Sequence, residues 1–117
     1  MAKIRHIVFH TTDVERLAKF YVDVMGLEIV HRAKNGGISL TDGYMNFSIH
    51  TNKIDGKPSG FNHFGFEVED VASLRGTCAE LSAASGIDKR PPNREAEYRV
   101  HDPDGNPIDL SQHGWPI

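Results

Sequence analysis

Two histidines and one aspartate lie at positions that belong to an internal repeat. The interval from His6 to His63 recurs between four other identical pairs: Phe9 and Phe66, Asp13 and Asp70, Val14 and Val71, Leu17 and Leu74. A second, slightly longer interval relates Asn46 to Asp109, and also Ser48 to Ser111 and His50 to His113. Two imidazoles and one carboxylate suit a first-row divalent metal and leave coordination positions open for water or substrate. Open positions indicate a catalytic metal rather than a structural one.

Other polar residues share the predicted strand faces with these three. His10 and Glu67 are also related by the first interval, and either has the chemistry to move a substrate proton. Further polar residues, which we expect to line the same pocket, lie on the strands that close each half: Asn46, Ser48, His50, Ser111 and His113.

The elements that must position these residues form two similar modules. Each begins with a strand in which apolar and polar residues alternate and continues with a helix whose apolar residues recur every three or four positions. Three short strands, separated by turns that contain Gly and Asp, end each module. Residues 12–15 offer a helix N-cap and, in Glu15, a capping-box glutamate, and Gly26 ends the first helix. The predicted strands are 3–10, 27–32, 37–40, 44–50, 61–68, 87–90, 95–101 and 107–112, and the second helix runs from Asp70 through Leu81 to Gly86.

The strands of the repeats carry apolar side chains on one face and histidines and other polar groups on the other. Because each helix must bury its apolar stripe, the apolar strand faces belong beneath the helices. The polar faces then turn toward each other as a cup. A buried polar group without a partner costs about 1–3 kcal/mol, so these faces either hold water or line a site in which a cation satisfies them. We therefore expect an α+β fold of tandem βαβββ modules, with a curved mixed sheet forming the cup and the helices outside.

Length and composition indicate one domain. The 117 residues divide into a first module at 1–52, a polar linker at 53–60 and a second module at 61–117. A net charge of −3 with scattered basic residues argues against nucleic acid and anionic membranes as partners. A single cysteine, Cys78, excludes an intramolecular disulfide, and neither a signal peptide nor a long apolar run is apparent. We expect a cytoplasmic location.

Three pieces of the sequence resemble the vicinal oxygen chelate superfamily, which includes glyoxalase I, extradiol dioxygenases, fosfomycin-resistance proteins, methylmalonyl-CoA epimerase and metal-free bleomycin-resistance proteins. They span nearly the whole chain and are specific in combination: His6 before an Asp13-led helix with Phe20-Tyr21 and Gly26-Leu27, HFGFEVED at 63–70, and DPDGNPIDL at 102–110.

The resemblance implies a divalent metal held at the positions of His6, His63 and Asp109. Members of the family usually have Glu where this chain has Asp109, and Asn46 stands where glyoxalase-like members have a fourth ligand. The resemblance also places Tyr98 near an active-site tyrosine of dioxygenase relatives. Lys89 falls near a phosphonate-contacting lysine of fosfomycin-resistance relatives.

The predicted function is a divalent-metal enzyme that binds a small molecule through two adjacent oxygens. The metal is Fe, Mn, Zn, Ni or Co, and the reaction is that of a lyase or isomerase or of an extradiol-type dioxygenase. The alternatives are a thiol transferase acting on fosfomycin and a metal-free protein that binds a drug or other ligand. The apolar end of the chain, Trp115-Pro116-Ile117, is a candidate contact surface for a homodimer, in which His6 could serve the cup of its own or of the other chain.

Overall fold

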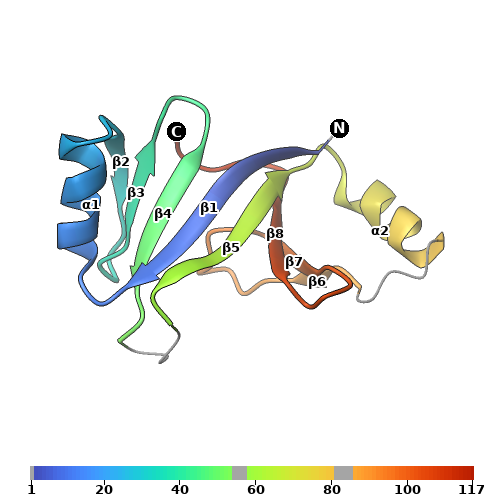
Figure 1. Ribbon diagram of the computed structural model, residues 1–117. Helices are drawn as coiled ribbons and strands as arrows, with labels where there is room; N and C mark the ends of the chain where they lie inside the picture. Colours follow the sequence, from blue (N-terminus) through green and yellow to red (C-terminus); the bar gives the residue numbers. More distant parts are fainter. Residues whose placement is uncertain (1, 54–57, 81–85) are drawn as a thin grey trace. The chain divides into compact units, whose positions relative to one another are not determined.

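The computed structural model describes residues 2–53, 58–80 and 86–117, with the side chains of 78–80 excepted. The side chain of Cys78, the part of the predicted second helix from Leu81 to residue 85 and half of the predicted linker, 54–57, lie outside the described residues. Two helices and eight strands follow one another along these ranges (Figure 1). They are β1 (Lys3–Thr11), α1 (Val14–Asp23), β2 (Glu28–Arg32), β3 (Ile38–Thr41), β4 (Asn46–Thr51), β5 (Gly60–Glu67), α2 (Val71–Glu80), β6 (Asp88–Lys89), β7 (Tyr98–His101) and β8 (Pro107–Ser111). The predicted α+β class and the tandem βαβββ order are confirmed.

The chain divides into two compact units. The first unit comprises His6–Asn62 and Pro116–Ile117, and the second comprises His63–Trp115 together with the residues up to Arg5. Each unit therefore contains one βαβββ module and a short terminal segment from the other end of the chain. Within the described ranges, neither helix has the length and apolar character needed to cross a membrane.

The sheet of the first unit has the strand order β2-β3-β4-β1, with β1 and β4 parallel and the other pairs antiparallel. Helix α1 lies beside this sheet (Figure 1). Alternation places every second side chain of β3 and β4 on the helix side. The core there consists of Ala18, Ile38, Leu40 and Ile49, with Val14, Leu17, Tyr21, Val22, Leu27 and Phe47 packed around them.

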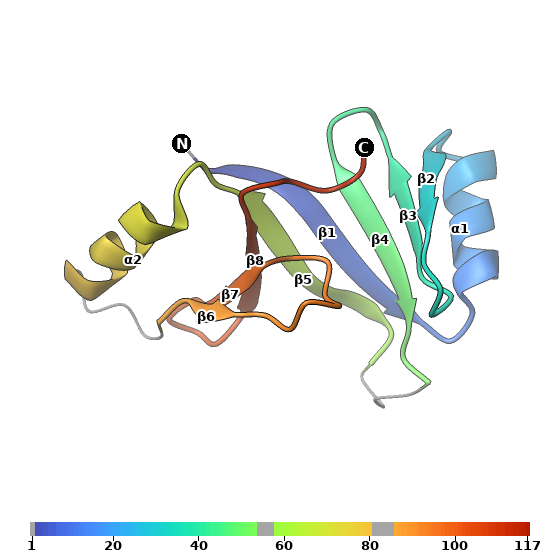
Figure 2. The same ribbon diagram turned by 180° about the vertical axis from the view of Figure 1, so that it is seen from behind.

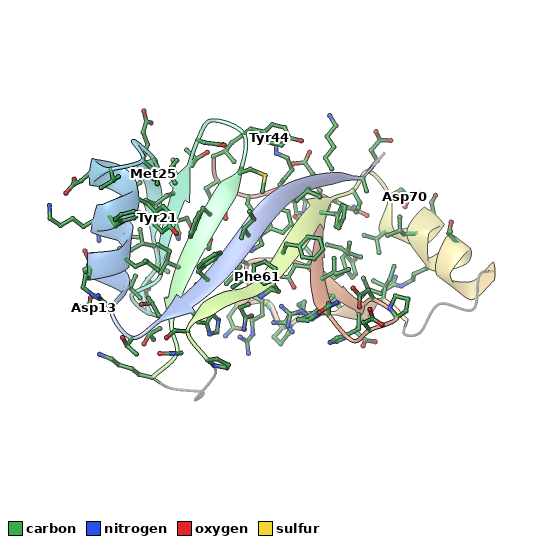
Figure 3. All side chains as sticks on the ribbon, in the orientation of Figure 1. Asp13, Tyr21, Met25, Tyr44, Phe61 and Asp70 are labelled. Carbon is green, nitrogen blue, oxygen red and sulfur yellow. The ribbon has the colours of Figure 1, made fainter. Side chains whose placement is uncertain are left out.

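Asp13 is the N-cap of α1, and its Oδ1 accepts a hydrogen bond from the Arg16 backbone N–H at 3.1 Å. Figure 3 shows Asp13 at the start of this helix. The predicted capping box does not form: with Asp13 as the cap, Glu15 is one residue too early, and its carboxylate instead accepts from Arg32 on β2 at 2.9 Å. The helix ends as predicted near Gly26, whose φ of 76° is costly for other residues.

The sheet of the second unit has the matching order β5-β8-β7-β6, again with one parallel pair, β5 and β8. Strands β6, β7 and β8 lie side by side in Figure 2. Asp70 precedes α2 (Figure 3), and its carboxylate accepts from the Ala72 N–H and the Ser73 hydroxyl. The core is Val68, Val71, Ile87 and Leu110, surrounded by Phe66, Leu74, Tyr98, Val100 and Ile108.

In both units the side of the sheet away from the core carries the polar residues, which we call the polar face. In the first unit His6 pairs with Asn46 and His10 with His50 across β1 and β4. In the second unit Asp109 of β8 lies between Gly65 of β5 and Arg99 of β7. The predicted separation of apolar and polar strand faces is therefore confirmed.

The two units differ in strand register. The interval that relates His6 to His63 also relates Val8 to Gly65. Val8 pairs with Ser48 in the first unit, whereas Gly65 pairs with Asp109 in the second. Asp109 thus occupies the strand position of Ser48 rather than that of Asn46, which the sequence repeat predicts. The shift leaves Asp109 diagonal to His63, within reach of its ring.

We expect Asp13→Ala to lower the free energy of unfolding by about 1 kcal/mol, because the substitution removes the acceptor for the Arg16 N–H. Asp13→Asn is the matched control, since it removes the charge but keeps a side-chain oxygen, and it should lose much less. Urea unfolding followed by circular dichroism measures both. An equal loss in the two variants would contradict a hydrogen-bonded cap.

Candidate functional site

His6 is the end of a chain of hydrogen bonds inside the first unit. Its Nδ1 lies 2.7 Å from Asn46 Oδ1, and the Ser48 hydroxyl donates to the same oxygen at 2.8 Å. Ser39 Oγ lies 2.9 Å from Ser48 Oγ. All four side chains are buried, with His6 and Ser48 at 0% exposure. Strands β1, β4 and β3 each contribute, so the orientation of the imidazole is fixed by the sheet itself.

This network sets the tautomer of His6. Asn46 Nδ2 donates to the Pro116 carbonyl at 2.6 Å, and a carbonyl can only accept, so the amide nitrogen faces Pro116 and the amide oxygen faces His6. That oxygen can only accept as well, and therefore His6 Nδ1 carries the proton. In the neutral ring the lone pair is then on Nε2, the arrangement in which a histidine ligates a metal through Nε2. Asn46, predicted as a pocket residue, holds His6 in place.

Asp109 is the centre of an ionic network inside the second unit. Its Oδ2 lies 3.0 Å from His63 Nε2, and its Oδ1 accepts from Arg99 Nε at 2.8 Å and Nη2 at 2.7 Å. Asp109 is 4% exposed. Gly65 opposite it has no room for a side chain, because a Cβ there would lie 2.8 Å from the Trp115 ring and 3.1 Å from the Asp109 carbonyl oxygen. Strands β5, β7 and β8 thus enclose the carboxylate.

The balance of charges keeps Asp109 ionised. Burial by itself would raise the pKa of its carboxyl group, but the hydrogen bond and charge of His63 and the charge of Arg99 outweigh burial and hold the pKa below its usual range. The second unit therefore offers an anionic oxygen beside an imidazole, which is the donor chemistry of a metal ligand pair.

Ser111 and His113, both predicted pocket residues, belong to a turn at the end of β8. Ser111 is fully buried, and its hydroxyl donates to Glu97 Oε2 at 2.7 Å and accepts from the Gly114 N–H at 2.9 Å. Glu97 Oε1 accepts from the backbone of Gln112 at 3.0 Å. His113 is exposed. Ser111 holds the turn, and His113 lies at its surface.

The two candidate proton carriers lie on the polar faces, as predicted. Glu67 pairs with Ser111 across β5 and β8, and its carboxylate lies 3.9 Å from the Arg5 guanidinium. His10 is 8% exposed, and its ring centroid lies 6.4 Å from that of His50. His50 lies against Gly37, where a Cβ would come within 2.6 Å of the imidazole.

Tyr98 and Lys89 lie on the other side of the sheet. Tyr98 pairs with Leu110, packs in the core and has the Arg75 guanidinium 5.3 Å from its ring centroid. Lys89 pairs with Tyr98 across β6 and β7 and is exposed. Because side chains alternate along a strand, neither shares a face with Asp109. The predicted catalytic role of Tyr98 and pocket role of Lys89 are therefore not retained.

Sequence reasoning missed Arg99, although a signal for it was present. The turn at 102–106 joins β7 and β8 as a hairpin in which His101 pairs with Pro107 and, two positions back, Arg99 pairs with Asp109. Counting outward from the DPDGN turn would have found this partner. The same count places the polar neighbours of Asp109 at odd-numbered positions of β7, which excludes Tyr98.

The fold is that of the vicinal oxygen chelate proteins. A family model described as "Glyoxalase/Bleomycin resistance protein/Dioxygenase superfamily" matches residues 3–110, and the chain belongs to this superfamily.

Known proteins with similar sequences include a probable lactoylglutathione lyase of Vibrio cholerae, 23% identical over 95% of this chain and 91% of its own length. A probable chloroplastic lactoylglutathione lyase of Arabidopsis thaliana is 24% identical over 96% of this chain, which spans 36% of that protein.

Solved structures show the same fold. The 2,3-dioxygenase LapB from Pseudomonas sp. KL28 aligns over 98% of this chain and 41% of its own, with a TM-score of 0.72 and 19% identity. Methylmalonyl-CoA epimerase from Mycobacterium tuberculosis aligns over 92% of this chain and 85% of its own, with a TM-score of 0.73 and 16% identity. The proteins that this chain resembles are thus named as lyases, a dioxygenase and an epimerase.

We predict that the neutral His6 ring in the metal-free protein carries its proton on Nδ1, because Asn46 Oδ1 must accept from it. Long-range ¹H–¹⁵N spectra of the imidazoles distinguish the two tautomers. Asn46→Asp keeps the acceptor and should keep this tautomer, whereas Asn46→Ala should release the ring to the Nε2–H form that is usual in water. An Nε2–H ring in the unaltered protein would show that the deduced orientation of Asn46 is wrong.

Proposed function

We propose that the chain is a divalent-metal-dependent vicinal oxygen chelate enzyme acting on a small molecule with two adjacent oxygen atoms. In this proposal His6, His63 and Asp109 hold the metal. The observation that carries it is the Asp109 network: a buried carboxylate kept ionised beside an imidazole on the polar face of a superfamily member.

The three residues fit a divalent ion by their donor chemistry. His6 already has its lone pair on Nε2, because Asn46 holds the proton on Nδ1. His63 Nε2 donates to Asp109 Oδ2, so its proton must move to Nδ1 or leave before Nε2 can act as a ligand. Metal binding would therefore release Asp109 Oδ2 from its hydrogen bond, while Arg99 continues to hold Oδ1. Fe, Mn, Zn, Ni and Co all accept two imidazoles and a carboxylate.

A bound divalent metal would supply an electrophile that polarises the two substrate oxygens. The polar faces would supply the group that moves a substrate proton. We infer that this group is Glu67 rather than His10, because Glu67 shares the polar face of Asp109 and is held only loosely by the Arg5 guanidinium, 3.9 Å away. A carboxylate in that position suits the removal of a proton from a carbon next to a carbonyl group.

One observation favours a second candidate, a metal-free ligand-binding protein. Asp109 is already neutralised by Arg99 and hydrogen-bonded to His63, so the carboxylate is satisfied without an ion. In that case the polar faces would bind a ligand through hydrogen bonds, and Glu67 would have no proton to move.

Metal titration of the purified, chelator-treated protein separates the two candidates. We expect one divalent ion to bind with high affinity to each set of His6, His63 and Asp109. Residues that only orient a metal ligand contribute about 10–100-fold to affinity, so Asn46→Ala should weaken metal binding by about that factor. His63→Ala removes a ligand itself and should weaken metal binding by more than about 100-fold. Isothermal titration calorimetry with Mn, Zn, Ni and Co, and Fe(II) without oxygen, measures these affinities.

His31→Ala is the matched control, because His31 is exposed on β2 and takes no part in either network described above. It should bind metal as the unaltered protein does. Failure of every metal to bind, or equal losses in His31→Ala and His63→Ala, would reject the metalloenzyme in favour of the binding protein.

The homodimer remains a prediction. Trp115, part of the predicted contact surface, packs against Gly65 and is 9% exposed, whereas Ile117 is 47% exposed. Sedimentation at micromolar concentration should give twice the chain mass of 13.0 kDa, and a monomer would contradict the prediction. In a dimer, His6 could complete the site of its own chain or of its partner.

A further inference from the structure

Two arginines lie on the polar face of the second unit beside the Asp109 network, and a third lies between them in the chain. Arg99 pairs with Asp109 across β7 and β8. One step further from β8, the Arg90 N–H donates to the Glu97 carbonyl at 2.8 Å, which continues the pairing of β6 with β7. Since side chains alternate, Arg90 lies on the same side of the sheet as Glu97 and Arg99. Arg94 lies in the connecting loop, and its N–H donates to the Pro91 carbonyl at 3.1 Å.

Two acidic side chains of this face, Glu97 and Asp109, are engaged elsewhere, and a third, Asp88, pairs with Arg99 across β6 and β7 and is exposed. Glu97 accepts from Ser111 and from the backbone of Gln112, and Asp109 accepts from His63 and Arg99. Within the described part of the chain, no ion pair joins Arg90 or Arg94 to a carboxylate, and the buried Nε of Arg90 has no hydrogen-bond partner. Arg99 uses Nε and one Nη2 proton on Asp109 and keeps its other N–H groups.

Two positive charges act on the guanidinium group of Arg90. Burial lowers the pKa of Arg90, and the positive charges of Arg99 and Arg94 lower it further, while Asp109 opposes the shift. Bringing like charges together around a partly buried arginine costs free energy, because Asp109 is already paired with Arg99 and the carboxylate of Asp88 is exposed to water. An incoming anion would remove that cost.

We propose that Arg90 and Arg99 form an anion subsite that binds an oxyanion group of the substrate, a carboxylate or a phosphate, next to Asp109. That the bound anion belongs to the substrate rests on the proposed function. The planar guanidinium fork matches both groups with two parallel hydrogen bonds, which a lysine cannot provide. The substrate would then carry a terminal oxyanion as well as the two adjacent oxygens, and Lys89, on the other face of the sheet, would not contact it.

The test is an anion titration of the metal-free protein, with inorganic phosphate and malonate as separate probes. Side-chain ¹H–¹⁵N spectra report on Nε–H of each arginine. We expect the Nε–H signal of Arg90 to shift with saturation and the Arg90→Gln variant to bind the anion about tenfold more weakly. Tighter binding of phosphate than of malonate would identify a phosphate-bearing substrate, and the reverse order a carboxylate-bearing one.

Lys89→Gln is the matched control, because it removes the same charge from the adjacent residue on the opposite face. Its affinity for either probe should stay within about twofold of the unaltered protein. Arg90→Lys keeps the positive charge but loses the planar guanidinium group, so its affinity for the anion should lie between those of Arg90→Gln and the unaltered protein. This variant shows whether a loss in Arg90→Gln comes from misfolding. Equal weakening by Lys89→Gln and Arg90→Gln, or an Arg90 signal that does not move, would overturn the subsite.

Metal binding, measured in parallel, keeps this inference separate from the proposed function. Arg90→Gln should bind metal as the unaltered protein does, and His63→Ala should retain anion binding while losing the metal. A protein that takes up anions at Arg90 but binds no metal would reject the metalloenzyme and leave the subsite in place. Metal binding without any response of Arg90 would reject the subsite alone.

Discussion

The second unit is organised around one buried carboxylate, that of Asp109. A carboxylate removed from water carries a desolvation penalty of several kcal/mol. His63 and Arg99 offset this penalty with hydrogen bonds to one oxygen each, at 3.0 Å and 2.7 Å. Removing either partner would leave a charge that is buried without compensation, which typically costs about 3–5 kcal/mol. Strands β5, β7 and β8 are thus tied together on their polar face by an ionic contact as well as by the backbone ladder.

The two modules share an order of elements but use different polar chemistry. In the first unit the polar face is neutral, and a chain of hydroxyl and amide groups fixes the tautomer of His6. In the second unit the network is ionic, and two cationic or potentially cationic side chains surround Asp109. The two copies have thus diverged: one module carries an oriented neutral imidazole and the other an anionic oxygen, and both groups have the chemistry of metal ligands.

Patterns that depend on one strand at a time were readable from the sequence. Alternation separated Ile7 and Phe9 from His6 and His10, and the same rule placed Asp109 and Ser111 opposite Leu110. Patterns that depend on pairing were not. The longer repeat interval aligned Asp109 with Asn46, but the register between β5 and β8 puts Asp109 at the position of Ser48, which no single-strand pattern encodes.

The loop region before β7 shows the same limitation for individual residues. Tyr98 and Lys89 were placed in the pocket by resemblance to other proteins, yet β7 begins at Tyr98, whose ring completes the core. A shift of one residue in an alignment exchanges the two faces of a strand. The resemblance selected Tyr98 and Lys89, whereas their neighbours Arg99 and Arg90 lie on the side of the sheet that carries Asp109.

Arg99 determines how strongly a cation and an anion would influence each other in the proposed site. Its guanidinium neutralises much of the Asp109 charge, and so it weakens the attraction of that carboxylate for a metal ion. An oxyanion bound to Arg90 and Arg99 would in turn cancel part of the positive field and restore that attraction. By linkage the effect is reciprocal: a metal on Asp109 would offset the negative charge of that carboxylate, so Arg99, still bonded to Oδ1, would attract the anion more strongly. The ion pair that satisfies Asp109 in isolation is therefore compatible with a metal site, provided that metal and anionic substrate bind together.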